Sequence, residues 1–307
     1  MHHWLRPDRP NLHAHFSSLA RPVLTIDSGD TVSFATPDVS WGLEPPTSTT
    51  APRRKVEPRD PAKDNGPCLC GPVAVRGAMP GDTLEILMEH VRPSAWGWTY
   101  AGNGMANPAY NSALGLIDAP LALMRWELDA DRRAATNQLG HSVAVRPFPG
   151  TIGLSPAAEH ADGWTPRATG GNMDCRELIA GTMLLLPVEV EGGLLSIGDG
   201  HAAQGDGEMS GTAIECAMEE VRVRLTVLSR MRIKGPRIKT AGGWATLGFG
   251  STLDAASMEA SSAMLDLLQE ELGLGRSDAL ALASAKVDLR ITQQVNPLKG
   301  VHAVFRL

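Results

Sequence analysis

The sequence predicts a mainly β protein with a small α+β segment at its C-terminal end. Its 32 glycines and 22 prolines recur at short intervals through the first 250 residues, a distribution typical of short strands joined by turns. Apolar and polar residues alternate in several segments, whereas apolar residues take helical spacing after residue 250. We therefore expect a β-rich body over residues 1–250 and an α+β segment over residues 251–307 that packs on it.

The strands are predicted from alternation, in chain order. Residues 23–26 and 31–34 flank the turn Ser28-Gly29-Asp30, and residues 83–91 alternate like a half-buried strand. Residues 183–190 and 194–197 are expected to pair around Glu191-Gly192-Gly193. Residues 219–227 give the clearest period of two, with valine or leucine at every second position.

Two long loops and two helices complete the prediction. Residues 36–65 are rich in proline, threonine and charge, and residues 96–112 contain three scattered glycines, so both are expected to be loops. Residues 253–272 have helical spacing and end at Gly273. Ser277-Asp278 is expected to cap a second helix that runs to about residue 285, and residues 287–294 then alternate like a strand.

The bulk composition excludes several classes of protein. The chain is 43% hydrophobic and 20% charged, and its net charge of −6 does not suggest a nucleic-acid partner. No stretch approaches the roughly 20 apolar residues of a membrane span, and the N-terminus lacks the apolar run of a signal peptide. The four cysteines include no Cys-x-x-Cys pair. We therefore expect a reduced, cytoplasmic protein.

Residues 198–208 are the strongest candidate for a functional site. They contain Gly-Asp-Gly-His and Gly-Asp-Gly-Glu, with Gln204 between them. Glycine lets polar side chains converge, and in extended backbone Asp199 and His201 point to one side, as do Asp206 and Glu208. Mixed Asp, His and Glu ligands suit zinc or manganese, whereas an all-oxygen set suits calcium or magnesium. Each acid taken alone is more typical of a turn than of a catalytic site.

Three other segments carry polar side chains that could converge on this one. His13 lies beside a predicted strand, and the alternative is that it is an ordinary surface histidine. Asp38 follows a predicted strand, and the alternative is that it only forms a turn. Residues 170–175 repeat the theme of glycine with polar side chains, and their N–H groups suit either an oxyanion hole or a tight turn. The serine-hydrolase elbow, the phosphate-binding loop and the dinucleotide fingerprint are absent from the sequence.

These blocks resemble the acetamidase/formamidase family. The resemblance is carried by residues 11–13, 16–17, 22–24, 29–32, 36–38, 71–78, 80–84, 170–174, 198–215 and 288–293. It spans nearly the whole chain and is most specific over residues 198–215. The sequence departs from the family pattern over residues 41–63 and at Cys68-Leu69-Cys70, which leaves the particular amide open.

The resemblance implies a β-sandwich body with a small α+β part. It also implies hydrolysis of a short-chain linear amide, acetamide-like or formamide-like, to a carboxylate and ammonia by a homodimer or larger homo-oligomer. Alternatives are a non-catalytic β-sandwich protein with structural calcium, and hydrolysis of a lactam.

The leading hypothesis assigns a role to each matched polar residue. A divalent ion, zinc rather than calcium or manganese, is expected on some of four ligands: His13, Asp38, Asp199 and His201. Glu208 is expected to move a proton, Asn172 to orient the substrate and Asp174 to complete the site. Gly171 and Gln204 are expected to contact the substrate.

Overall fold

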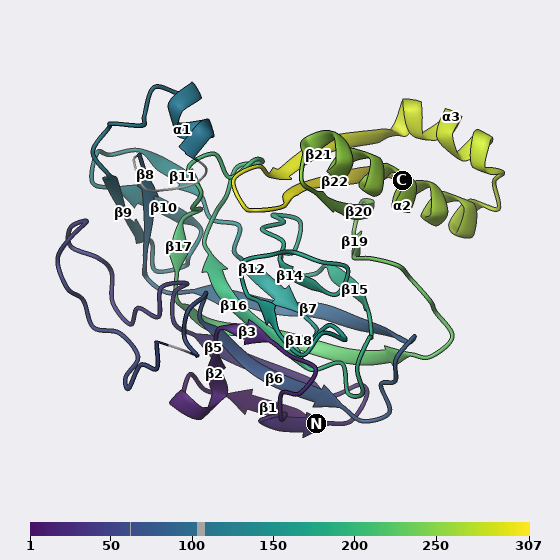
Figure 1. Cartoon of the computed structure of the whole chain (residues 1–307), viewed down its shortest axis with the longest axis horizontal. Helices are drawn as coiled ribbons and strands as arrows, with labels where there is room; N and C mark the ends of the chain where they lie inside the picture. The colour runs from purple at the N-terminus through teal and green to yellow at the C-terminus, as the bar shows by residue number, and fades with distance from the viewer. Residues whose placement is uncertain (62, 103–107) are drawn as a thin grey trace.

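The strands of the computed structural model form two large sheets and one short pair, so the prediction of a mainly β fold is confirmed (Figure 1). The structure describes residues 1–61, 63–102 and 108–307. No described helix is both long and apolar enough to cross a membrane.

Within the described residues, the first sheet has nine strands. Their spatial order is β1 (His2–Leu5), β5 (Thr31–Thr36), β18 (Met218–Leu228), β7 (Thr83–Pro93), β15 (Met183–Pro187), β19 (Arg237–Thr240), β20 (Gly243–Gly250), β22 (Lys299–Arg306) and β21 (Val287–Gln293). The predicted strands at residues 31–34, 83–91, 219–227 and 287–294 all lie in this sheet.

The second sheet has eleven described strands and is branched. Its main order is β11 (Ser142–Ala144), β10 (Ala134–Asn137), β9 (Ala122–Leu128), β8 (Trp96–Ala101), β17 (Glu215–Cys216), β16 (Leu195–His201), β12 (Phe148–Gly153) and β14 (Gly170–Asn172). β6 (Leu69–Val75) pairs with β16 and also with β2 (Leu12–His13) and β4 (Leu24–Ile26). A separate pair joins β3 (His15–Phe16) to β13 (Ala161–Asp162).

The main hydrophobic core lies between the two large sheets. Phe34 of β5 and Ile86 of β7 belong to the same buried cluster as Ile152 of β12 and Ile197 of β16. β5 also contacts β6 and β16 directly. Every residue of β16 is buried, so the polar side chains at its C-terminal end stand in the protein interior.

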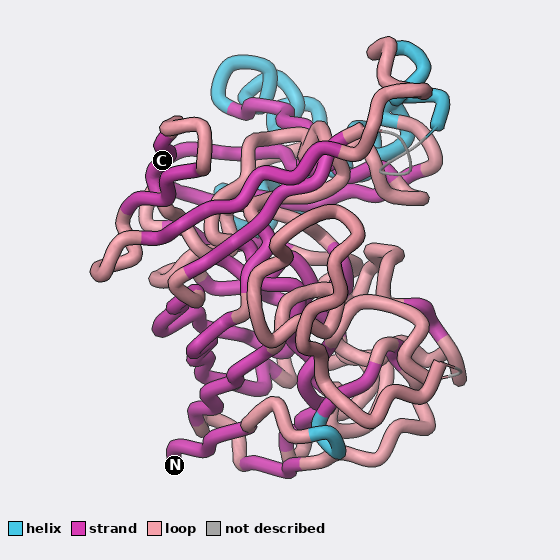
Figure 2. Tube along the Cα trace, turned by 90° about the vertical axis from the view of Figure 1, so that its left-hand side faces the viewer, coloured by secondary structure: helices cyan, strands magenta, loops and turns pink. Residues whose placement is uncertain are grey.

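The helices are short or C-terminal: η1 (Arg9–Asn11), α1 (Pro108–Ala113), α2 (Leu253–Leu272) and α3 (Arg276–Lys286). α2 has the predicted bounds because the Thr252 hydroxyl caps its first turn and Gly273 ends it with a left-handed φ of 67°. α2 packs on β20 and β22. Figures 1 and 2 show these C-terminal helices at the end of the molecule opposite the N-terminus.

Three predictions about local structure are wrong. Ser277-Asp278 does not cap α3, because the helix begins at Arg276 after the N-cap Gly275, which makes no side-chain cap hydrogen bond. Residues 183–190 and 194–197 do not pair, because β15 pairs with β7 and β19 whereas β16 belongs to the other sheet. Gly192 and Gly193, both with positive φ, lie where the chain passes from one sheet to the other. Residues 96–101 form β8 instead of a loop, because they pair with β9 over six positions.

The other long loop agrees with the prediction. Residues 37–61 and 63–65 contain neither strand nor helix. Residue 62 and residues 103–107 of the two predicted loops lie outside the described residues, and residues 108–113 form α1.

Candidate active site

The C-terminal end of β16 carries the first two candidate side chains. Asp199 and His201 are two residues apart on this strand, and their side chains meet. The Nε2 atom of His201 lies 3.2 Å from Oδ1 of Asp199. It also lies 3.4 Å from Oε1 of Glu215, which stands directly opposite His201 on β17. Strand pairing therefore sets one imidazole between two buried carboxyl groups.

Asp174 is held beside this group by amide side chains. Asn172, at the end of β14, donates a hydrogen bond to Oδ2 of Asp174 at 3.0 Å. Asn296, from the turn after β21, donates to the same oxygen at 2.6 Å. The Thr151 hydroxyl lies 2.6 Å from Oδ1 of Asn172 and 3.2 Å from Oδ2 of Asp199. These contacts join three strands of the second sheet to the turn between β21 and β22 at one point.

Three acids of the site adopt left-handed backbone conformations. The φ angles are 50° at Asp174, 56° at Asp199 and 46° at Glu208. This region costs a residue other than glycine about 1–2 kcal/mol. Such strain persists where the surrounding structure imposes it, and it concentrates at functional sites.

Gly150 of β12 provides the space in which the side chains meet. A Cβ atom at this position would lie 2.5 Å from Cε1 of His201 and 2.8 Å from an oxygen of both Asp174 and Asp199. Real Cβ atoms essentially never make contacts below 3.0 Å. The close approach of the three side chains therefore requires glycine here.

Burial and mutual charge set the protonation of the acids. Burial, together with the charge of Asp199, raises the pKa of Asp174 to about 8. Burial raises the pKa of Glu215 to about 7, although His201 opposes this shift. Burial and the charge of Asp174 raise the pKa of Glu208 well above its usual range. These three groups can therefore carry protons near neutral pH.

Asp199 and His201 behave as a charged pair. Burial acts to raise the pKa of Asp199, but the charge and the hydrogen bond of His201 bring it below its usual value. Burial acts to lower the pKa of His201, but the charges of Glu215 and Asp199 raise it well above its usual value. Without a bound cation, an ionised Asp199 therefore faces a protonated imidazole, and a cation bound by His201 would take the place of a ring proton.

The donor atoms suit a divalent cation. One ligand atom from each of Asp174, Asp199 and His201 lies within 4.8 Å of the others, and the same holds for His201, Glu208 and Glu215. Oδ1 of Asp174, Nδ1 of His201 and Oε2 of Glu215 are buried and have no hydrogen-bond partner among the described residues. Buried polar atoms normally have partners, so these atoms are available to bind an ion. Carboxylate and imidazole together are ligands typical of zinc.

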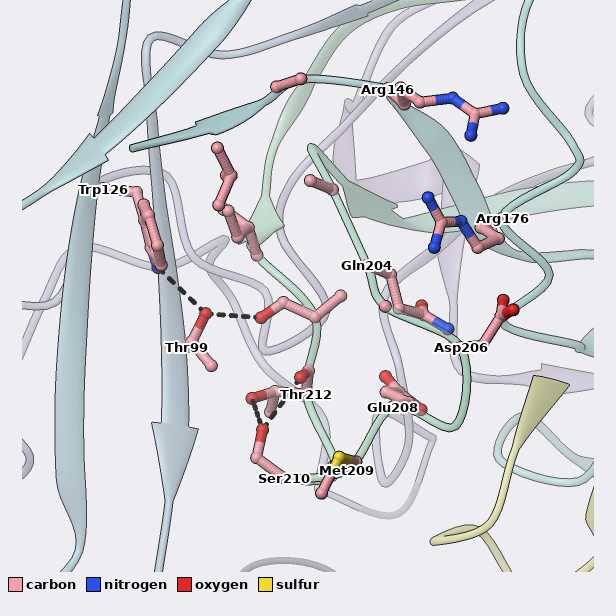
Figure 3. Close-up of a pocket in the computed structure, with 16 residues that line it drawn as sticks. Thr99, Trp126, Arg146, Arg176, Gln204, Asp206, Glu208, Met209, Ser210 and Thr212 are labelled. Carbon is pink, nitrogen blue, oxygen red and sulfur yellow. Dashed lines mark hydrogen bonds between the residues drawn. The ribbon is translucent and has the colours of Figure 1, made fainter. Parts of the chain in front are cut away.

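Two cavities meet at Glu208 and Thr212. The smaller, about 150 Å³, is bordered by the acids of the site and by Trp98 and Trp164. The larger, about 610 Å³, lies beside residues 203–206 and reaches Arg146 and Arg176 (Figure 3). Figure 3 shows Glu208 between Gln204 and Met209 at the edge of this larger cavity.

His13 lies outside both groups of ligand atoms. Its Nδ1 atom is 2.7 Å from the carbonyl oxygen of His15, and its Nε2 atom is 2.9 Å from the hydroxyl of Ser196. Burial lowers the pKa of His13 to about 4. Both ring nitrogens thus have protein partners, and the role of His13 as a metal ligand stays a prediction.

Asp38 also lies outside the two groups, although it contacts the wall of the smaller cavity. Its Oδ2 atom accepts a hydrogen bond from Nε1 of Trp98 at 2.8 Å and pairs with Arg53. Asp38 thus fixes the indole of Trp98, and its role as a metal ligand likewise stays a prediction.

The two predicted substrate contacts differ in position. Gly171 pairs with Ile152 on β12 and is not among the residues that line the two cavities. Gln204 lines the larger cavity, and its Nε2 atom donates to the carbonyl oxygen of Asp174 at 2.7 Å. Both contacts with substrate stay predictions.

Three residues of the site were not predicted from the sequence: Glu215, Gly150 and Asn296. Glu215 lies within the block of residues 198–215, but only the pairing of β16 with β17 brings it opposite His201. Gly150 and Asn296 reach the site from distant parts of the chain. No local pattern in the sequence indicates that Gly150 or Asn296 belongs to the site.

Known proteins resemble this chain in sequence. The sequence matches the Acetamidase/Formamidase family over residues 8–168 and 159–301. It is 44% identical over 193 residues to the formamidase of Methylophilus methylotrophus, which covers 46% of this chain and 47% of that protein. The chain spans between 47% and 60% of the length of the curated relatives that it matches.

Solved structures resemble it over nearly their full length. A predicted acetamidase/formamidase from Thermoanaerobacter tengcongensis is 27% identical and superposes with a TM-score of 0.86 over 100% of this chain and 96% of that one. An acetamidase from Bacillus halodurans is 29% identical, with a TM-score of 0.84 over 99% of this chain and 97% of that one.

Proposed function

The chain belongs to the acetamidase/formamidase family, and we propose that it is an amidohydrolase that cleaves a short-chain linear amide to a carboxylate and ammonia. One observation carries this proposal: four buried carboxyl groups surround His201 at a cavity of about 150 Å³. Such a site combines donors for a cation with groups that carry protons near neutral pH, and each of these assists amide hydrolysis.

We propose that Asp174, Asp199 and His201 hold a zinc ion. When bound, this ion would polarise the amide carbonyl and lower the pKa of a water molecule. The mixed oxygen and nitrogen donors, the unpartnered Oδ1 and Nδ1 atoms and the space above Gly150 support this ligand set.

Glu208 is the proposed proton carrier. Its carboxylate would accept a proton from the attacking water and donate it to the leaving ammonia. Its position supports this role, since it borders both cavities and its pKa is raised by burial and by Asp174. The Asn172 amide, which lines the smaller cavity, would orient the substrate amide.

Replacement of Glu208 by glutamine tests the proposal. General acid–base groups contribute about 10²–10⁴-fold to rate, so E208Q should lower kcat for acetamide or formamide by at least about 100-fold. The glutamine keeps the size of the side chain, and the circular dichroism spectrum should not change. The matched control is E219Q on the half-exposed carboxylate of Glu219, which should retain activity. An E208Q enzyme with full activity would remove Glu208 from the mechanism.

We also propose a cytoplasmic homodimer or larger homo-oligomer. All four cysteines are unpaired, which supports a reducing compartment. Leu289 and Ile291 are 53% and 38% exposed on the edge strand β21, which supports contact with a second copy. Light scattering should give at least twice the mass of one chain, and a monomeric mass would contradict the oligomer.

A further inference from the structure

The larger cavity contains two arginines that the proposed mechanism does not use. Arg146 and Arg176 both line it, and Figure 3 shows the two arginines on the same side of the cavity. In the part of the chain that the structure describes, neither guanidinium has an ion pair or a hydrogen bond. The guanidinium of Arg290, by contrast, forms ion pairs with both Glu177 and Asp206.

The acids near this cavity do not compensate the two charges. Asp206 accepts the guanidinium of Arg290 at 2.6 Å. Glu208 supplies at most one negative charge against the two guanidinium groups. The cavity is therefore left with an excess of positive charge, which favours an anionic group in a bound molecule.

The size and walls of the cavity indicate an elongated ligand. Its volume of about 610 Å³ lies in the range of sites for molecules much larger than acetamide. Trp126, Val143 and Ile214 give it apolar walls. It adjoins the smaller cavity at Glu208 and Thr212, so one molecule can extend from the acids toward the arginines.

We propose that the substrate is an amide whose far end carries a carboxylate, such as the half-amide of a dicarboxylic acid, and that Arg146 and Arg176 bind this carboxylate. This inference rests on amide hydrolysis as the proposed function. The guanidinium group binds carboxylates in a planar, bidentate geometry, and its charge-assisted hydrogen bonds are the strong ones. Water adds to the amide carbon, the carbon–nitrogen bond breaks, and the products are a dicarboxylate and ammonium.

Turnover of matched substrates tests the proposal. Ammonia release is measured from succinamate, glutaramate and adipamate and from butanamide, pentanamide and hexanamide. A hydrogen bond to a charged group contributes about 1.5–3 kcal/mol, so the best half-amide should exceed its neutral counterpart in kcat/KM by about 10-fold or more. The double variant R146Q/R176Q should reduce this preference to about one. The control R230Q removes an exposed arginine that does not line the cavity and should keep the preference.

Calorimetric titration with glutarate gives a readout that does not need turnover. The wild-type protein should bind glutarate, and R146Q/R176Q should bind it at least about 10-fold more weakly. Equal turnover of neutral amides and half-amides would overturn the proposal. So would equal loss of acetamide and half-amide turnover in the double variant, because the arginines would then act only on the structure of the site.

Failure of the proposed function itself would look different. In that case no amide, formamide and acetamide included, would release ammonia. Glutarate binding that depends on the arginines would then still support a carboxylate site, and its absence would contradict one.

Discussion

Gly150 makes the site possible because it has no side chain. Its replacement by alanine would place Cβ within 2.8 Å of the carboxyl oxygens of Asp174 and Asp199 and 2.5 Å from His201. These side chains come from the buried interior and cannot move far without losing their hydrogen bonds. We expect G150A to lower kcat/KM by about 100-fold or more, since a displacement of about 1 Å at a reacting group costs that much.

The control for this variant is G242A. Gly242 has nothing within 4 Å of its ideal Cβ position and lies in an exposed turn. G242A should keep activity, and circular dichroism should detect whether G150A has a folding defect. A fully active G150A enzyme would mean that the three side chains need not lie as close as they do here.

His13 predicts a dependence of stability on pH. Its folded-state pKa of about 4 lies below the ordinary value of about 6.5, because burial disfavours the charged ring. The unfolded chain therefore binds more protons between these two values, and the free energy of unfolding falls as pH falls through that window. By this linkage His13 should cost about 2 kcal/mol of stability between pH 7 and pH 5.

H13Q cannot titrate, so its urea-unfolding free energy should decrease by about 2 kcal/mol less than that of the wild type over the same range. H141Q, at an exposed histidine, serves as the control. Identical pH profiles for H13Q and the wild type would show that His13 does not stay neutral in the folded protein.

At the scale of elements, β21 holds the loop that carries Glu208. The Arg290 guanidinium on this strand lies 2.6 Å from Asp206 and 2.6 Å from Glu177. The backbone N–H of Gly207 donates to the carbonyl oxygen of Thr292, and that of Gln294 donates back to Gly207. Asn296, just beyond the strand, bonds Asp174. The C-terminal segment therefore positions two acids of the site.

We expect R290Q to loosen this loop. It leaves two partly buried carboxylates unpaired, which should cost about 1–3 kcal/mol of stability and about 10-fold in kcat/KM. Hydrogen exchange over residues 204–208 should accelerate, whereas that of β7 and β18 should not change. R306Q breaks the exposed pair with Asp288 on the neighbouring strand and should have little effect. Unchanged exchange in R290Q would contradict a positioning role for β21.

Over the whole molecule, the sequence predicts the elements better than their pairing. Helix α2 was predictable to the residue because its cap and its stop lie next to it in the chain. The strand that pairs with residues 183–187 was not predictable, because alternation indicates a strand but does not show which other strand it pairs with. The same limit applies to the site. The resemblance and the glycine-rich segment pointed to Asp174, Asp199, His201 and Glu208, which the structure brings together.

Long-range pairing brings in the residues that the sequence could not indicate. Glu215 becomes a neighbour of His201 only when β17 pairs with β16. The sequence indicated His13 and Asp38 as candidate metal ligands. In the structure, both make hydrogen bonds to groups outside the two sets of ligand atoms. A local pattern identifies the kinds of side chain that gather, and the sheet topology decides which of them meet.

Removal of bound metal should affect the stability of the whole molecule. Without a cation, the four carboxyl groups around His201 repel one another in a buried setting, and only protons relieve that repulsion. A ligand at about 100 times its Kd stabilises the native state by about 2.7 kcal/mol. Dialysis against a chelator should therefore abolish amide turnover and lower Tm by several degrees, and added zinc should restore both.

Metal analysis of protein purified without added metal should find about one ion per chain, and D199N should reduce that content. D288N changes an exposed carboxylate on β21 and should leave it unchanged. If no ion is found, and if chelation changes neither activity nor Tm, then Asp174, Glu208 and Glu215 must keep their protons in the working enzyme. The raised pKa values of Asp174, Glu208 and Glu215 would then describe the catalytic state itself, and amide hydrolysis here would rest on acid–base groups alone.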